Sequence, residues 1–153
     1  MKSLDFIFIG SPKNKAFKEL EEEYHKRIKR YMSSQITTLK DSTEKNTAVK
    51  NKKETASILD KIQPADFLVL CDEKGKGFDS KTLANKINSW RQDYQRIVFV
   101  IGGAYGFSED IYKRANLKLK FSDFTLPHEL ARTVLLEQVY RSFTILGGEK
   151  YHH

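Results

Sequence analysis

The chain has 153 residues, of which 39% are hydrophobic and 31% charged, a balance typical of one folded domain. No apolar run approaches the roughly 20 residues that a membrane-spanning helix needs, and the short apolar start of the chain contains an acidic residue, unlike a signal peptide. The single cysteine, Cys71, excludes an internal disulfide and a cysteine-based zinc site. We therefore expect a cytoplasmic protein with no membrane partner.

The charge of the chain is unevenly distributed. There are 27 Lys and Arg against 20 Asp and Glu, a formal net charge of +7. The segment from Ser11 to Lys53 has 12 basic and 6 acidic residues, a difference of +6. A basic surface of this size suits a polyanion such as nucleic acid, and a solvated lysine-rich surface is the alternative interpretation.

Strand and helix patterns alternate along the first half of the chain. The predicted elements are a strand over Lys2–Ile9 stopped by Gly10-Ser11-Pro12, an amphipathic helix over Lys13–Tyr31, a strand over Gln35–Lys40, a loop over Asp41–Asn46 and a helix over Thr47–Ile62.

The alternation continues in the second half. The predicted elements are a buried strand over Phe67–Cys71, a glycine-containing loop over Asp72–Phe78, a helix capped by Ser80 and running to about Trp90, a strand over Ile97–Ile101, a short helix capped by Ser108, a strand over Leu117–Phe121, a loop over Ser122–Leu126, a long helix from Pro127 to about Phe143 and a short tail. The pattern predicts a single α/β domain over residues 1–153 with a mostly parallel sheet.

Three loops follow apolar strands, after Cys71, Ile101 and Phe121. In open α/β sheets ligands bind beyond the carboxyl ends of the strands, so these loops predict the pocket. Gly102-Gly103 lets backbone approach a ligand closely, although a tight strand-to-helix turn explains the pair equally well. The pair matches neither G-x-G-x-x-G nor the P-loop, which disfavours a phosphate cradle.

The long helix carries His128 and Arg132, which are four residues apart and share one face near its start. The alternatives are an ion pair of Arg132 with Glu129 or Glu137, and a His128 without any chemical role. The rest of the helix is apolar nearly all the way round, which predicts burial on more than one side and hence a subunit interface. The histidines form no metal constellation, and G-x-S-x-G of serine hydrolases is missing.

A set of motifs in fixed order resembles the RlmH (YbeA) family of the SPOUT superfamily. The motifs are Val100–Gly106, Phe121–Arg132, Leu136–Arg141 and the ending Tyr151-His152. The length and the opening strand also fit, so the resemblance covers the whole chain.

The resemblance implies a fold and an activity. Members of the family are α/β proteins whose C-terminal part forms a trefoil knot, and they are homodimers. They bind S-adenosylmethionine in the knot and need no metal. They methylate N3 of a pseudouridine in helix 69 of 23S ribosomal RNA (the conventional 1915 site), acting on assembled ribosomes.

The resemblance also implies cofactor-binding residues in this chain. Leu70 and Gly102 match residues of the family that contact the cofactor, and Gly103 adjoins them. The matching knot loop consists of Phe121, Ser122, Asp123, Phe124, Thr125 and Leu126. Relatives often carry Lys and Met where this chain has Asp123 and Phe124, Gln or Pro where it has Glu129, and Lys or Arg where it has His153.

Methylation of N3 requires help for a weakly acidic N–H, either by proton removal or by stabilisation of the anion. We expect Arg132 to act as the electrostatic stabiliser and His152 as base or positioning group, with Tyr151 and His128 as further candidates. The basic segment from Lys13 to Lys53 would then hold RNA phosphates.

Two other functions fit part of the pattern. A non-catalytic RNA-binding α/β module accounts for the charge and the aromatic content, and it predicts no binding of S-adenosylmethionine. A flavodoxin-like or nucleotide-binding enzyme needs a phosphate loop after the first strand, and Gly10-Ser11-Pro12-Lys13 is a poor one.

Overall fold

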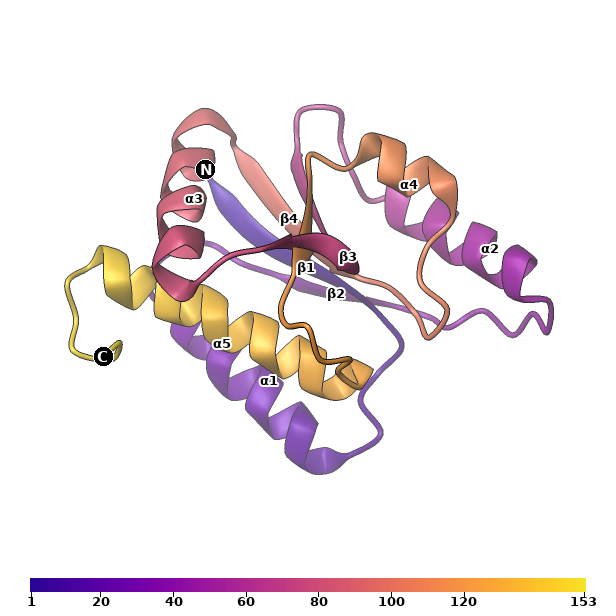
Figure 1. Ribbon diagram of the computed structural model, residues 1–153, viewed down its shortest axis with the longest axis horizontal. Helices are drawn as coiled ribbons and strands as arrows, with labels where there is room; N and C mark the ends of the chain where they lie inside the picture. The colour runs from indigo at the N-terminus through magenta and orange to yellow at the C-terminus, as the bar shows by residue number, and fades with distance from the viewer.

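The computed structural model describes residues 1–153 and contains one five-stranded sheet (Figure 1). The strands are β1 (Ser3–Ile9), β2 (Ile36–Leu39), β3 (Phe67–Gly77), β4 (Arg96–Ile101) and β5 (Leu117–Lys120), and the helices are α1 (Lys15–Ile28), α2 (Thr47–Leu59), α3 (Ser80–Asp93), α4 (Glu109–Arg114) and α5 (His128–Leu146). The strand order is β2-β1-β4-β3-β5, and every pair is parallel. The predicted α/β class with a parallel sheet is confirmed.

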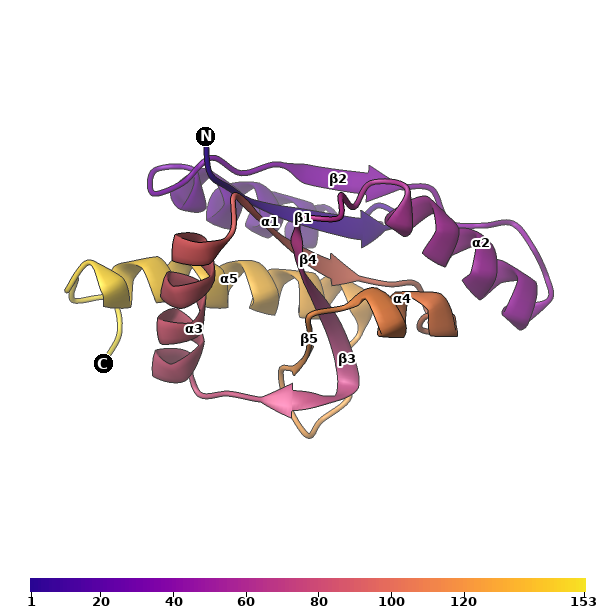
Figure 2. The same ribbon diagram turned by 90° about the horizontal axis from the view of Figure 1, so that it is seen from above.

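Helices cover both faces of the sheet and make three layers (Figure 2). Because side chains alternate along a strand, Phe6 and Phe8 of β1 pack in the cluster with α1, α3 and α5. Ile7 and Ile9 belong to the second cluster, which lies under α2 and α4. Because residues at odd and at even positions of these strands are both buried, one on each face of the sheet, the strand sequences are continuous hydrophobic runs rather than alternating ones.

The long helix α5 lies against α1 and α3 (Figure 1). Its side chains Leu135, Leu136, Val139 and Phe143 are buried in the core of the same chain. Most of the apolar surface of α5, from which we predict a subunit interface, is therefore already buried by its own subunit. The homodimer stays a prediction. None of the helices combines the length and the apolar character needed to cross a membrane.

The glycine-containing segment after Cys71 is a strand, so the predicted loop over Asp72–Phe78 is wrong. Strand β3 continues to Gly77 after an irregularity, and Lys76 pairs with Leu119 of β5. A Cβ on Gly75 would lie 2.7 Å from backbone atoms of Lys118, so only glycine permits this approach of the two strands.

The predicted helix caps are wrong in detail. Helix α3 is capped by Asp79, whose Oδ1 accepts the backbone N–H of Thr82 at 2.7 Å, and not by Ser80. Ser108 does occupy the N-cap position of α4, but its hydroxyl makes no capping bond. Helix α5 begins after Pro127 as expected and ends at Leu146 rather than Phe143.

Candidate active site

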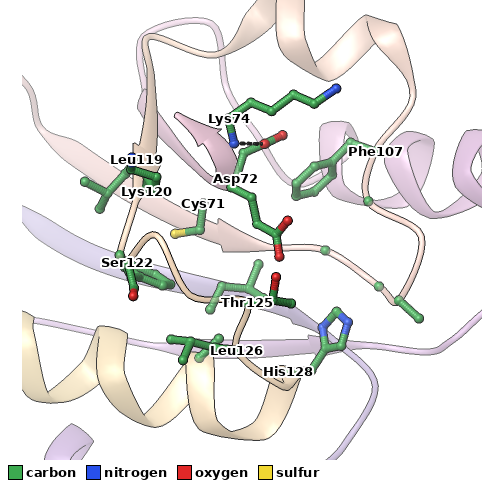
Figure 3. Close-up of a pocket in the computed structure, with 18 of the residues that line it drawn as sticks. Cys71, Asp72, Lys74, Phe107, Leu119, Lys120, Ser122, Thr125, Leu126 and His128 are labelled. Atoms are coloured by element: carbon green, nitrogen blue, oxygen red, sulfur yellow. Dashed lines mark hydrogen bonds between the residues drawn. The ribbon is translucent and has the colours of Figure 1, made fainter. Parts of the chain in front are cut away.

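A cavity of about 500 Å³ opens at the carboxyl ends of β4 and β5 and beside the irregular middle part of β3 (Figure 3). It is lined by three segments that are far apart in the sequence, residues 71–74, 101–107 and 119–126 except Asp123, together with Tyr112 of α4 and the start of α5. The parallel sheet brings these segments together because all its strands end at the same edge. The segments that follow the three predicted apolar strands therefore do meet in one pocket, although the first of them continues as strand β3 instead of forming a loop.

Most of the predicted cofactor-binding residues line this cavity. They are Gly102, Gly103, Phe121, Ser122, Phe124, Thr125 and Leu126, and His128 lines it as well. Leu70 does not, because its side chain is fully buried in the cluster under α2 and α4, and the next residue, Cys71, faces the cavity instead. Asp123 points to solvent and pairs with Lys120 at 2.6 Å, which holds the pKa of its carboxyl below the usual value.

The glycine pair has a packing role that the sequence alone did not reveal. A Cβ on Gly102 would lie 2.6 Å from Cε1 of Phe107, and a Cβ on Gly103 would lie 2.5 Å from Oε1 of Glu54. The space that a Cβ atom would need at each glycine is therefore already occupied by a side chain of the same chain. The pair thus allows the segment to pack tightly against Phe107 and Glu54, and Phe107 in turn forms part of the cavity wall.

Two polar side chains in the cavity wall were missed by the sequence analysis. Asp72 accepts a hydrogen bond from the hydroxyl of Tyr112 at 2.6 Å and one from the backbone N–H of Lys74 at 2.8 Å. Burial, and next this hydrogen bond, raise the pKa of the Tyr112 phenol. The signal for Asp72 was its position, two residues past Leu70 at the end of a buried strand.

Arg132 lies beside the cavity residue Ala131 but does not itself line the cavity. The guanidinium is only 4% exposed: Nε donates to Oε1 of Glu21 at 2.5 Å, and Nη1 donates to the carbonyl of Gly10 at 2.7 Å. Its Cζ also lies 4.4 Å from the ring centroid of Phe8. Neither acid weighed as a partner from the sequence is the one used, because Glu21 comes from the neighbouring helix α1.

Two opposite effects act on the pKa of the Glu21 carboxyl. Burial raises its pKa and is the larger effect, while the charge and hydrogen bond of Arg132 lower it. The net direction is upward from the ordinary value. The two groups therefore hold each other in a site that neither would occupy in ionised form alone.

The C-terminal tail lies beyond the opposite end of α5 from the cavity (Figure 1). Tyr151 donates its hydroxyl to Glu137 at 3.0 Å, and Nδ1 of His152 lies 3.0 Å from Nη1 of Arg141. Helix α5 has 19 residues, which corresponds to about 28 Å. Within one subunit the fold does not bring Tyr151 or His152 to the cavity.

A parallel sheet under helices, with a cavity built from loops beyond its strand ends, is the arrangement of ligand-binding α/β enzymes. The chain belongs to a family described as predicted SPOUT methyltransferases, whose model matches residues 2–152.

Curated proteins named ribosomal RNA large subunit methyltransferase H are similar over their full length. The protein of Maridesulfovibrio salexigens is 39% identical over 155 aligned positions, covering 100% of this chain and 99% of that protein. The protein of Mycoplasmopsis agalactiae is 40% identical over 153 positions, covering 99% of each. The protein of Clostridium botulinum is 40% identical over 157 positions, covering 98% of this chain and 99% of that protein.

Proposed function

We propose that this protein transfers a methyl group from S-adenosylmethionine to N3 of a pseudouridine in helix 69 of 23S ribosomal RNA, in the large subunit or the assembled ribosome of the cytoplasm. One observation carries the proposal: the segments 101–107 and 119–126, which α4 separates, line a single cavity. These segments overlap two of the four motifs on which the family resemblance rests, and the similar curated proteins are named as methyltransferases of large-subunit ribosomal RNA.

The residues of the cavity suit the proposed cofactor. About half of the lining residues are hydrophobic, which fits an adenine ring. The carboxylates of Asp72 and Glu73 could accept hydrogen bonds from the ribose hydroxyls and attract the positively charged part of the cofactor. The cofactor, when bound, supplies an electrophilic methyl group on a positively charged sulfur. Backbone groups at Gly102 and at Phe121–Leu126 would hold the cofactor, and the apolar walls would exclude water.

The chain must also handle the N3 proton and the negative charge that its loss leaves on the base. His128 at the start of α5 is the one predicted catalytic residue that lines the cavity, and it is our candidate for handling the proton within the same subunit. Arg132 has one guanidinium nitrogen, Nη2, without a hydrogen bond in the chain, and this nitrogen is the one available for stabilising the anion. The remaining nitrogens are occupied by Glu21 and Gly10.

Tyr151 and His152 belong to this proposal only in a homodimer. Their place beyond the far end of α5 means that the tail of one subunit would lie over the cavity of the other. Gly148, with φ of +68°, forms the turn that starts this tail and is suited to redirect it. The proposed dimer forms through α5, and the trefoil knot implied by the resemblance would be formed by the C-terminal segment around the cavity.

The basic residues from Lys13 to Lys53 are not equivalent as phosphate contacts. Lys53 pairs with Glu44 at 2.5 Å, and Arg27 pairs with Glu23 at 2.9 Å. Lys50 and Lys52 on α2 form no ion pair, and α2 lies beside the glycine segment of the cavity, since Glu54 contacts Gly103 and Asn51 bonds to Tyr105. We therefore place the proposed phosphate contacts chiefly on α2.

The test is a calorimetric titration of the purified protein with S-adenosylmethionine, followed by methylation of ribosomes that lack the modification. We expect saturable binding and a mass increase of one methyl group on the helix 69 fragment of 23S RNA. Binding of RNA without any binding of the cofactor would refute the proposal and favour the non-catalytic RNA-binding module.

A further inference from the structure

A tight turn presents one aromatic ring at the mouth of the cavity. Gly106 donates its N–H to the carbonyl of Gly103 at 3.1 Å and has φ of +78°, which closes the turn over residues 103–106. Tyr105 is the third residue of this turn, and it is 62% exposed although it lines the cavity. The turn geometry thus directs a large ring toward solvent at a functional opening.

Exposed aromatic rings are rare in this chain and gather at the cavity. Only Tyr31, Tyr105 and Phe124 are exposed among the phenylalanine, tyrosine and tryptophan side chains. Tyr105 and Phe124, at 62% and 83%, line the cavity. Neither ring packs against another aromatic ring of the chain, whereas Tyr31 stacks on Phe143. No aromatic side chain of the chain therefore covers either ring, and both rings expose apolar surface on which a planar ligand can stack.

Helix α2 holds the Tyr105 turn in place and adds a positive charge beside the ring. The side-chain amide of Asn51 donates to the carbonyl of Tyr105 at 2.9 Å, which fixes the backbone and leaves the ring free. Nζ of Lys50 lies 5.9 Å from the centroid of the same ring. Lys50 forms no ion pair and is not part of the cavity wall, so its charge lies outside the opening.

We propose that Tyr105 and Lys50 form a nucleotide platform at the cavity mouth, on which the ring of Tyr105 stacks with an unpaired RNA base while Lys50 contacts its phosphate. This inference rests on the proposed function, since it places the RNA at the same cavity. Enzymes that modify a base take it out of its stack, and an aromatic side chain then replaces the lost stacking.

The pairing of ring and ammonium favours an RNA nucleotide over the adenine of the cofactor. A nucleotide within RNA presents a planar base and an anionic phosphate together, and Tyr105 and Lys50 match both. The adenosine of S-adenosylmethionine carries no phosphate beside its base, and the one anionic group of the cofactor, a carboxylate, is at the methionine end of the molecule. The exposure of Tyr105 also places the ring at the opening rather than in the inner wall formed by residues such as Ile101 and Leu119.

The experiment measures two affinities for each variant. Binding of fluorescently labelled protein to large ribosomal subunits is followed by anisotropy, and binding of S-adenosylmethionine by calorimetry. We expect Tyr105→Leu to weaken binding to the subunits about tenfold, within the range measured for base–aromatic stacking, and to leave the affinity for the cofactor within about twofold. Tyr105→Phe, which keeps the ring, should behave as the wild type.

Lys50→Gln tests the phosphate contact. It should weaken binding to the subunits and lower the slope of log K against log salt by about one. The matched control is Lys86→Gln on α3, because Nζ of Lys86 lies at a similar distance from an aromatic ring, 6.0 Å from the centroid of Phe78, and Phe78, unlike Tyr105, does not line the cavity. This control should leave the salt slope unchanged.

Three results decide the outcome. Unchanged binding of Tyr105→Leu to the subunits would overturn the platform, and so would an equal loss of cofactor affinity, which would assign the ring to adenine. If the wild type binds subunits in a Tyr105-dependent way but transfers no methyl group, the platform stands and the proposed function fails.

Discussion

The buried pair of Arg132 and Glu21 links helices α5 and α1 next to the candidate active site. Replacing Arg132 by alanine leaves the Glu21 carboxylate buried without its partner, and it also removes the hydrogen bond to Gly10 and the contact with the Phe8 ring. Breaking a buried ion pair from one side costs about 3–5 kcal/mol. We therefore expect Arg132→Ala to lower the free energy of unfolding by about that amount at neutral pH.

The loss depends on pH, with a sign fixed by Glu21. Its folded-state pKa is raised, so the stability that it contributes is present below its unfolded pKa and is lost as pH rises through the folded value. Without Arg132 the influences that lower this pKa disappear, and the carboxyl takes up a proton more readily. The destabilisation by Arg132→Ala should therefore be smaller near pH 5 than near pH 8.

The assay is urea unfolding of the wild type, Arg132→Ala, and the double variant Arg132→Ala with Glu21→Gln at both pH values. The neutral amide in the double variant should recover a large part of the lost stability and abolish its pH dependence. If Arg132→Ala unfolds within about 1 kcal/mol of the wild type at pH 8, Glu21 is not a buried unpaired charge and the reasoning fails.

The same variants separate structure from catalysis. If Nη2 of Arg132 stabilises the developing anion, the double variant should be folded and still lose about 10²–10³ in methylation rate. Glu21→Gln alone keeps the arginine and should retain most of the rate. A stable double variant that methylates ribosomes at the wild-type rate would assign Arg132 to structure alone.

Three further predictions concern the cofactor site and the subunit interface. Gly102→Val should push the ring of Phe107, 2.6 Å from the new Cβ, into the cavity and weaken cofactor binding more than tenfold. Calorimetry measures the affinity, and circular dichroism checks that the variant is folded; unchanged affinity would show that Gly102 is not part of the cofactor site. Deletion of Tyr151–His153 should abolish most methylation of ribosomes while cofactor affinity stays within a few-fold; a near wild-type rate would exclude the tail from catalysis. Light scattering at micromolar concentration should give the mass of a homodimer, two copies of 17.8 kDa whose formal charges of +7 add up to +14, and the mass of a monomer would contradict the interface through α5.

The pattern of apolar runs along the chain was enough to predict the class of the fold and the edge of the sheet at which the site forms. Continuous apolar runs such as Phe67–Cys71 and Ile97–Ile101 require cover on both faces, and helical patterns between them supply it. Once the strands are parallel, the loops that follow them must meet at one edge. Both conclusions depend on local periodicity and chain order, which a sequence contains in full.

Tertiary structure alone decided which side chains face the cavity and which are paired. Strand β3 runs to Gly77 because Gly75 lets it pack on β5, and the predicted loop had no local signal for that partner. The partner of Arg132 is Glu21, 111 positions away, instead of a neighbour on its own helix. The tail with Tyr151 and His152 ends far from the cavity of its own subunit. Each of these outcomes depends on contacts between segments remote in the chain, and their geometry is fixed only when the layers pack together.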